Sequence, residues 1–275
     1  MATGKSNVRK WARSFVFLPS VKFWLSKIPG LRAIYAPLWG VHPIDRELGI
    51  DTSGLVGTGE IHQDKGLTTL INPYIGSQPS IVRKGLAALG DCAEYTFVDF
   101  GGGKGRAVVV ASEFPFRNIM GIELSPSLAG TARSNASRIA LQFPDRSTVT
   151  IANANVSDFV LPPGRLACFN YHAFGLELLS EVVQKFEALL RGNTPHMFFV
   201  YYNPVHFEVL DNSSAFQRFY AQQLQYDESE IGFGPDVDDG VVIWQSVQGA
   251  VPTKHRGADR KIVLNASGER ARVVD

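Results

Sequence analysis

The chain has 275 residues, of which 45% are hydrophobic and 19% charged, a composition that supports a buried core and excludes intrinsic disorder. Its net charge of +1 gives no overall field for nucleic acid. No apolar run reaches transmembrane length and no signal-peptide pattern is present, so we expect a cytoplasmic protein.

The first 44 residues differ from the rest of the chain in charge. They contain seven Lys and Arg residues and no Asp or Glu, so the remaining residues carry a net charge of −6. Large aromatic side chains lie among the cations, and Pro19, Pro29 and Pro37 keep any helix short. Two interpretations stay open: the aromatic side chains pack on the main domain, or residues 1–35 contact anionic lipid at the membrane periphery.

Further along the chain, a glycine-rich polar stretch over 51–63 predicts a loop, and apolar residues at helical spacing predict a helix over 79–89. Short apolar runs then alternate with longer amphipathic stretches. The expected strands cover 95–100, 119–123, 148–152, 166–170 and 197–202. The expected helices cover 104–114, 127–143 and 176–190. This alternation predicts a parallel sheet with crossover helices on both faces.

The alternation stops after residue 202. A short helix is expected over 213–221, and strands over 222–226 and 241–246 form an expected antiparallel hairpin. The predicted fold is therefore an α/β, Rossmann-like, mostly parallel sheet with helices on both faces and a C-terminal antiparallel hairpin. We expect an N-terminal extension over 1–44, one catalytic domain over 45–250 and a tail over 251–275.

Three glycines, Gly101, Gly103 and Gly105, follow a predicted strand and open a predicted helix. Glycine permits positive φ and lets a ligand approach the backbone closely. A P-loop would need Gly at 98 and Ser or Thr at 105, but the chain has Val98 and Gly105. A dinucleotide fingerprint would need its third glycine at the position of Arg106, which disfavours a nucleotide-dependent oxidoreductase.

The remaining pattern, Asp99-x-Gly101-x-Gly103-x-Gly105, resembles motif I of the class I S-adenosylmethionine-dependent methyltransferases. The resemblance covers about residues 70–246. It implies that S-adenosyl-L-methionine, the methyl donor, binds across the three glycines. It also implies that Asp99 interacts with the methionine end of the donor, directly or through water.

Two later positions match the same family. Glu123 ends the next strand, where the family's carboxylate accepts hydrogen bonds from both ribose hydroxyls. Asn155 follows the third strand, at the position where the family commonly has an acid that accepts from the adenine amino group. The amide oxygen of Asn155 can also accept, and Asp158 is the alternative.

The segment over 72–79 precedes the first helix of the core. It resembles the Tyr-x-Pro-Thr/Ser-x-Pro segment that covers the donor in bacterial and mitochondrial protein-lysine methyltransferases. The resemblance implies that Tyr74 and Ser77 contact the donor. The alternative is a turn that only caps the helix.

Catalytic candidates follow the fourth and fifth strands, because such folds bind ligands at the carboxyl edge of the sheet. Asn170 and His172 lie in a segment that resembles an Asn-Pro-Phe-Gly motif of some bacterial relatives. Asn170 is expected to contact the donor, and His172 to act as a general base or only as a hydrogen-bonding imidazole. Tyr201 and Asn203 are the further catalytic candidates.

The expected function is methyl transfer from S-adenosyl-L-methionine to a small-molecule or protein acceptor by in-line displacement. The identity of the acceptor is unknown, and the near-neutral charge disfavours nucleic acid. The alternative is an inactive donor-binding scaffold, because Asn155 and His172 depart from the common family pattern. No metal site is expected, since Cys92 and Cys168 lack ligand spacing and suit buried thiols.

Overall fold

The computed structural model describes residues 40–192, 194–234, 236–252 and 257–275. Most of the expected N-terminal extension therefore lies outside the described residues, as does the whole segment over 1–35 for which lipid contact was predicted.

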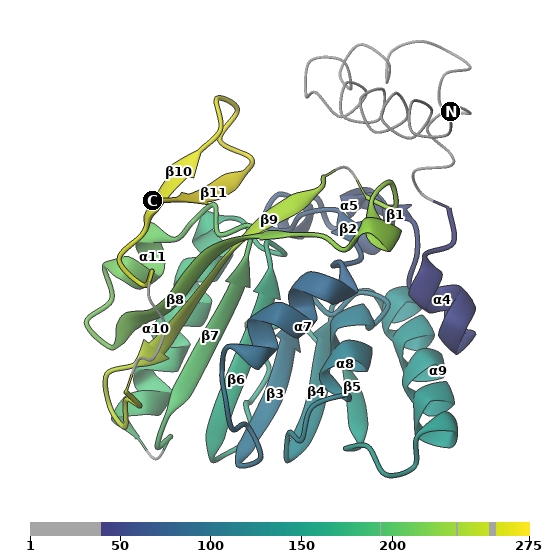
Figure 1. Cartoon of the computed structure of the whole chain (residues 1–275), viewed down its shortest axis with the longest axis horizontal. Coiled ribbons are helices and arrows are strands. Elements are labelled where there is room, and N and C mark those ends of the chain that lie inside the picture. Colours follow the sequence, from purple (N-terminus) through teal and green to yellow (C-terminus); the bar gives the residue numbers. More distant parts are fainter. Residues whose placement is uncertain (1–39, 193, 235, 253–256) are drawn as a thin grey trace, which may run out of the picture.

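The core is one seven-stranded sheet with the strand order β5-β4-β3-β6-β7-β9-β8. The five parallel strands are β3 (Tyr95–Phe100), β4 (Asn118–Glu123), β5 (Val149–Asn153), β6 (Arg165–Tyr171) and β7 (Met197–Tyr202). The antiparallel hairpin consists of β8 (Phe216–Gln225) and β9 (Asp238–Ser246), with β9 beside β7. Figure 1 shows this arrangement, which is the predicted Rossmann-like architecture.

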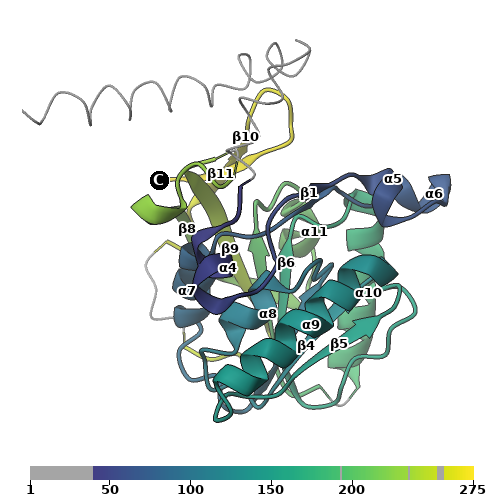
Figure 2. The same ribbon diagram turned by 90° about the vertical axis from the view of Figure 1, so that its right-hand side faces the viewer.

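Helices cover both faces of the sheet because its central strands are apolar on both sides. One face carries α7 (Pro79–Ala87), α8 (Arg106–Ala111) and α9 (Pro126–Gln142). The other face carries α10 (Leu176–Arg191) and α11 (Glu208–Asp211). Figure 2 shows α7 and α10 on opposite sides of the sheet. Every residue of β3 is buried, so this strand lies between the two cores.

Short elements gather at the carboxyl ends of the parallel strands (Figure 1). Before the core these are β1 (Leu55–Val56), α5 (Thr58–Ile61), α6 (Lys65–Thr68) and β2 (Tyr74–Ile75), whereas α4 (Pro43–Leu48) packs beside α9. After β8 they are η2 (Glu228–Glu230) and the hairpin of β10 (Lys261–Leu264) and β11 (Ala271–Val274). The loop predicted over 51–63 thus contains a helical turn, α5, and a short strand, β1, which forms by pairing with β2.

The predicted short helix over 213–221 is wrong, because β8 occupies most of this segment. Phe216 and Phe219 are three residues apart, a spacing that suits one face of a helix. A register irregularity between Arg218 and Tyr220 lets them lie in a strand with both rings buried. Pairing with β9 along the whole strand therefore overrides the local pattern.

The other predicted elements of the core lie within two residues of their expected bounds, except the helix over 104–114 and the strands over 222–226 and 241–246, which begin six and three residues earlier as β8 and β9. The helix predicted over 104–114 corresponds to α8, which begins only at Arg106, because Gly105 has φ 86° and cannot belong to a right-handed helix. Cys92 and Cys168 are free and buried, as predicted.

Candidate functional site

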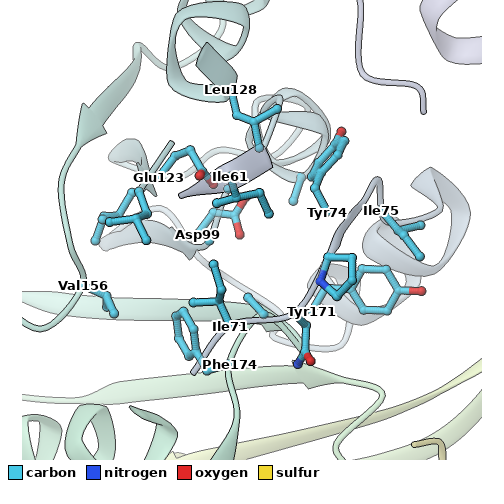
Figure 3. A pocket seen from close by; sticks show the side chains of 18 of the residues that line it. Ile61, Ile71, Tyr74, Ile75, Asp99, Glu123, Leu128, Val156, Tyr171 and Phe174 are labelled. Atoms are coloured by element: carbon cyan, nitrogen blue, oxygen red, sulfur yellow. The ribbon is translucent and has the colours of Figure 1, made fainter. Parts of the chain in front are cut away.

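A cleft of about 880 Å³, counting the space at its open mouth, lies at the carboxyl edge of the sheet. Open α/β sheets bind ligands at this edge. Figure 3 shows the cleft from close by. Its apolar walls are formed by Ile61, Ile71, Leu128, Val156 and Phe174, among others.

Strand register places the polar groups of the cleft on one face of the sheet. Asp99 of β3 pairs with Gly121 of β4 and with Phe169 of β6. Because side chains two residues apart in a strand share a face, Glu123 and Tyr171 project from the same face as Asp99. Figure 3 shows Asp99 beside Glu123, with Val156 on one side and Tyr171 on the other.

The glycine loop forms the floor of the cleft. Gly101, Gly103 and Gly105 all have positive φ, which an L side chain rarely adopts. A Cβ at Gly103 would lie 2.1 Å from the Tyr74 ring, and one at Gly101 would lie 2.6 Å from Cβ of Ala173. Only glycine at these two positions lets Tyr74 and Ala173 approach the loop this closely.

The Glu123 carboxylate is held by the loop that it faces. Its Oε2 accepts from the backbone N–H of Gly103 at 2.7 Å, and its Oε1 accepts from that of Ser125 at 2.7 Å. Burial raises the pKa of Glu123, and these backbone donors partly offset the effect. Both oxygens keep a lone pair for a ligand that donates two hydrogen bonds.

Asp99 differs from Glu123 in its hydrogen bonding. Its side chain is 3% exposed, and none of the described residues donates a hydrogen bond to its carboxylate. Burial and the nearby charge of Glu123 raise the pKa of Asp99 to about 8. A buried carboxylate without a donor is costly unless a ligand supplies positive charge.

The segment over 71–77 covers the cleft and is held in place by hydrogen bonds with Thr52 and Arg106. The Tyr74 hydroxyl donates to the Thr52 carbonyl at 2.7 Å. The buried Arg106 donates to Thr52 Oγ1 at 2.7 Å, to the Thr52 carbonyl at 2.8 Å and to the Gly76 carbonyl at 3.1 Å. Arg106 therefore holds this lid in place. The overlooked sequence signal was a charged residue at the start of an otherwise apolar helix.

Six of the predicted donor-binding residues line the cleft: Tyr74, Ser77, Asp99, Gly101, Glu123 and Asn155. The Asn155 side-chain oxygen already accepts from the Ser157 backbone N–H at 3.0 Å, so it caps a turn and offers a ligand its second lone pair. Gly103 and Gly105 lie just behind the lining, in the same loop.

Asn170 and His172 lie outside the lining of the cleft. Asn170 is fully buried, and its oxygen accepts from the Ala173 backbone N–H at 2.8 Å. Its Nδ2 has no hydrogen-bond partner among the described residues. His172 has φ 41°, and its Nδ1 lies 3.2 Å from the Tyr201 hydroxyl. Burial and the neighbouring His206 lower the pKa of His172 to about 4.

Tyr201 and Asn203 also lie outside the lining. Burial raises the pKa of Tyr201, so its hydroxyl stays protonated at neutral pH. Asn203 binds the C-terminal hairpin: its Nδ2 donates to the Glu269 carbonyl at 3.1 Å, and its Oδ1 accepts from the Ala271 backbone N–H at 2.8 Å. The structure therefore places none of the three predicted catalytic residues in the lining that contains Asp99 and Glu123. His172 and Tyr201 contact each other, whereas Asn203 binds the C-terminal hairpin.

Tyr171 is a cleft residue that the sequence analysis did not select. The signal was its position two residues after Phe169, on the face that Asp99 shares.

Within the described ranges, no cluster of His, Cys, Asp and Glu could hold a metal ion. In the same part of the chain, no helix is long and apolar enough to cross a membrane.

No protein-family profile matches the chain, and no curated protein matches its sequence. Among similar solved structures, the 23S rRNA methyltransferase ErmE has a TM-score of 0.43 and 15% identity, over 66% of this chain and 72% of its own. A dimethyladenosine transferase from Plasmodium falciparum has a TM-score of 0.45 and 12% identity, over 63% of each chain. The N-methyltransferase NodS from Bradyrhizobium japonicum, solved with S-adenosyl-L-homocysteine, has a TM-score of 0.43 and 11% identity, over 61% of this chain and 86% of its own. Function is therefore inferred from the residues of the cleft.

Proposed function

We propose that the chain binds S-adenosyl-L-methionine in this cleft and transfers its methyl group to a small-molecule or protein acceptor. The observation that carries the proposal is the pair of buried carboxylates, Asp99 and Glu123, at the glycine loop. The donor suits this pair because it bears a sulfonium, an α-ammonium and a ribose with two neighbouring hydroxyls.

Each end of the donor has a matching group. The α-ammonium would pair with Asp99, whose carboxylate lacks a donor in the described chain. The ribose hydroxyls would donate to the free lone pairs of Glu123, and the adenine amino group to Asn155. Tyr74 and Ser77 would cover the donor. Asn170 would hold Ala173, which lines the cleft, in place by accepting a hydrogen bond from its backbone N–H.

A phosphate-bearing ligand fits the loop poorly. The backbone N–H groups of Gly101 and Gly102 donate to the Ile122 carbonyl, and that of Gly105 donates to the Gly102 carbonyl. The N–H of Gly103 donates to Glu123. These groups are already used within the protein, and two carboxylates would repel an anion. This supports the exclusion of P-loop and dinucleotide ligands.

Bound in this way, the donor would supply a sulfonium methyl group whose carbon a nucleophile can attack, with the thioether sulfur as the leaving group. The protein's own contribution is to orient the reactants and exclude water. The lid of Tyr74, held by Arg106, serves both purposes. We propose that His172, Tyr201 and Asn203 contribute to activity indirectly, by holding in place the segments next to the cleft. His172 would be neutral at physiological pH.

Isothermal calorimetry with S-adenosyl-L-methionine and S-adenosyl-L-homocysteine tests the proposal. We expect binding of both, and we expect Glu123→Gln to weaken both at least about tenfold, since that substitution replaces charged acceptors (~1.4 kcal/mol). Glu94→Gln, which makes the same change at an exposed acid outside the lining, is the matched control. Absence of binding at millimolar concentrations would disprove the proposal.

Binding alone does not separate an enzyme from an inactive scaffold. Incubation of a cell lysate with protein and donor carrying a radiolabelled methyl group separates them. We expect label in one protein or small-molecule fraction, and none with Glu123→Gln. Donor binding without labelling would favour the scaffold.

A further inference from the structure

Glu123, Asp99 and Tyr171 form a row of polar side chains on one face of the sheet. This row continues beyond the part of the cleft that we assign to S-adenosyl-L-methionine. The Tyr171 hydroxyl donates to Asp239 Oδ2 at 3.2 Å. Register explains the contact, since Tyr171 pairs with Tyr202 and Tyr202 pairs with Val241. Asp239 lies two residues before Val241 in β9 and so projects from the same face as Tyr171.

Asp239 is the buried centre of a small network. It is 2% exposed, and the Tyr226 hydroxyl donates to the same Oδ2 at 2.6 Å. Arg270, from the C-terminal hairpin, lies 3.9 Å from its other oxygen and also pairs with Asp236. Burial and the charge of Asp236 raise the pKa of Asp239 to about 7, although Arg270 and the two tyrosines oppose the rise.

The two tyrosines differ in one respect. Tyr171 lines the cleft, whereas Tyr226 does not. The Tyr171 proton is directed to Asp239, and the Tyr226 hydroxyl lies beside the Tyr171 oxygen. That oxygen keeps a lone pair for a group in the cleft that donates a hydrogen bond. Tyr171 also lies on the side of the cleft away from Val156 (Figure 3).

We infer, on the basis of the proposed function, that Tyr171 contacts the methyl acceptor and that Asp239 positions its hydroxyl. The acceptor class that this arrangement recognises is a protic nucleophile, an amine or hydroxyl with an N–H or O–H bond. A thioether or tertiary amine, which carries no proton, would leave the oxygen of Tyr171 without a partner.

The proton balance closes within these residues. The N–H or O–H bond of the acceptor breaks, and its proton bonds to the Tyr171 oxygen while the Tyr171 proton moves to Asp239. A lone pair of the acceptor atom would form the bond to the methyl carbon, and the pair of the broken N–H or O–H bond would stay on the acceptor. The pair of the broken carbon–sulfur bond would stay on sulfur.

The test compares binding of two donor analogues by calorimetry. Sinefungin carries an amine in place of the transferable methyl group, whereas S-adenosyl-L-homocysteine carries nothing there. We expect Tyr171→Phe to weaken sinefungin about tenfold and to leave S-adenosyl-L-homocysteine within about twofold. We expect Asp239→Asn to reduce the preference for sinefungin as well, since an amide accepts more weakly than a carboxylate.

Tyr226→Phe is the matched control, because it removes the other hydroxyl from the same carboxylate oxygen. We expect it to lower the melting temperature without changing the ratio of the two affinities. Equal ratios in Tyr171→Phe and Tyr226→Phe would refute the inference. Failure of the unmodified protein to bind S-adenosyl-L-homocysteine would instead refute the proposed function.

Discussion

At the residue scale, Asp99 couples stability to ligand binding. In the folded protein its pKa is raised to about 8, from an ordinary value of 3.8. Between these values the unfolded chain has lost the proton and the folded chain keeps it. The contribution of Asp99 to stability is therefore greatest below pH 4 and is lost as the pH rises through 8.

Asp99→Asn should remove this dependence. We expect the variant to exceed the unmodified protein in free energy of unfolding at pH 9, by on the order of 1–3 kcal/mol, because an amide needs no ionisation in the buried site. Urea denaturation between pH 6 and 9 measures the difference. A variant that is less stable at pH 9 would contradict the pKa argument.

The affinity for S-adenosyl-L-methionine should change with pH in the opposite sense to the stability. The unmodified protein should bind S-adenosyl-L-methionine more tightly as the pH rises through about 8, because ionised Asp99 can pair with the α-ammonium. Asp99→Asn should bind weakly, with little dependence on pH in this range. Calorimetry across the same pH series tests both. An unchanged pH slope in the variant would assign the dependence to another group.

At the element scale, the sequence predicted the parallel core well because its strands are short, apolar and bounded by polar turns. Tertiary pairing decided the rest: β8 replaced an expected helix, and β1 formed only by pairing with β2. The glycine loop was found because it follows directly on a strand, and Glu123 was found because it ends the next strand. His172 was predicted as a site residue, and its neighbour Tyr171 was missed. A shift of one residue reverses the face to which a strand side chain points, so this difference exchanges a residue that lines the cleft for one that does not.

The close contact of lid and loop makes a prediction for Gly103→Ala. The new Cβ would lie 2.1 Å from the Tyr74 ring, so the lid must move. Gly90→Ala is the matched control, because Gly90 also has positive φ (76°) but nothing lies within 4 Å of its Cβ position. Both variants should lose about 1 kcal/mol from the left-handed backbone.

Only Gly103→Ala should also weaken S-adenosyl-L-homocysteine, at least about tenfold by calorimetry. Adding Tyr74→Ala to Gly103→Ala should restore part of the lost stability, which denaturation of the double variant measures. Equal effects of the two glycine substitutions on affinity would show that the lid does not rest on the loop during binding.

At the scale of the whole molecule, the cleft and the charge distribution come from different parts of the chain. Thr52, Tyr74, Glu123, Tyr171 and Asp239 meet at one edge although they span most of the described sequence. No local pattern could indicate that β9 and the C-terminal hairpin complete this edge. The charge asymmetry, in contrast, is readable from the sequence alone.

Residues 1–35 carry all seven positive charges of the first 44 residues, so removing them changes the net charge from +1 to −6. Each Lys or Arg near an anionic membrane contributes about 1 kcal/mol to binding. We therefore expect the full chain to sediment with phosphatidylserine-containing vesicles and the shortened chain to stay in solution. Neutral phosphatidylcholine vesicles are the control. Binding should also fall when salt is raised to about 1 M, where the Debye length is ~3 Å. Equal sedimentation of both chains would exclude the lipid contact and favour packing of these aromatic side chains on the main domain.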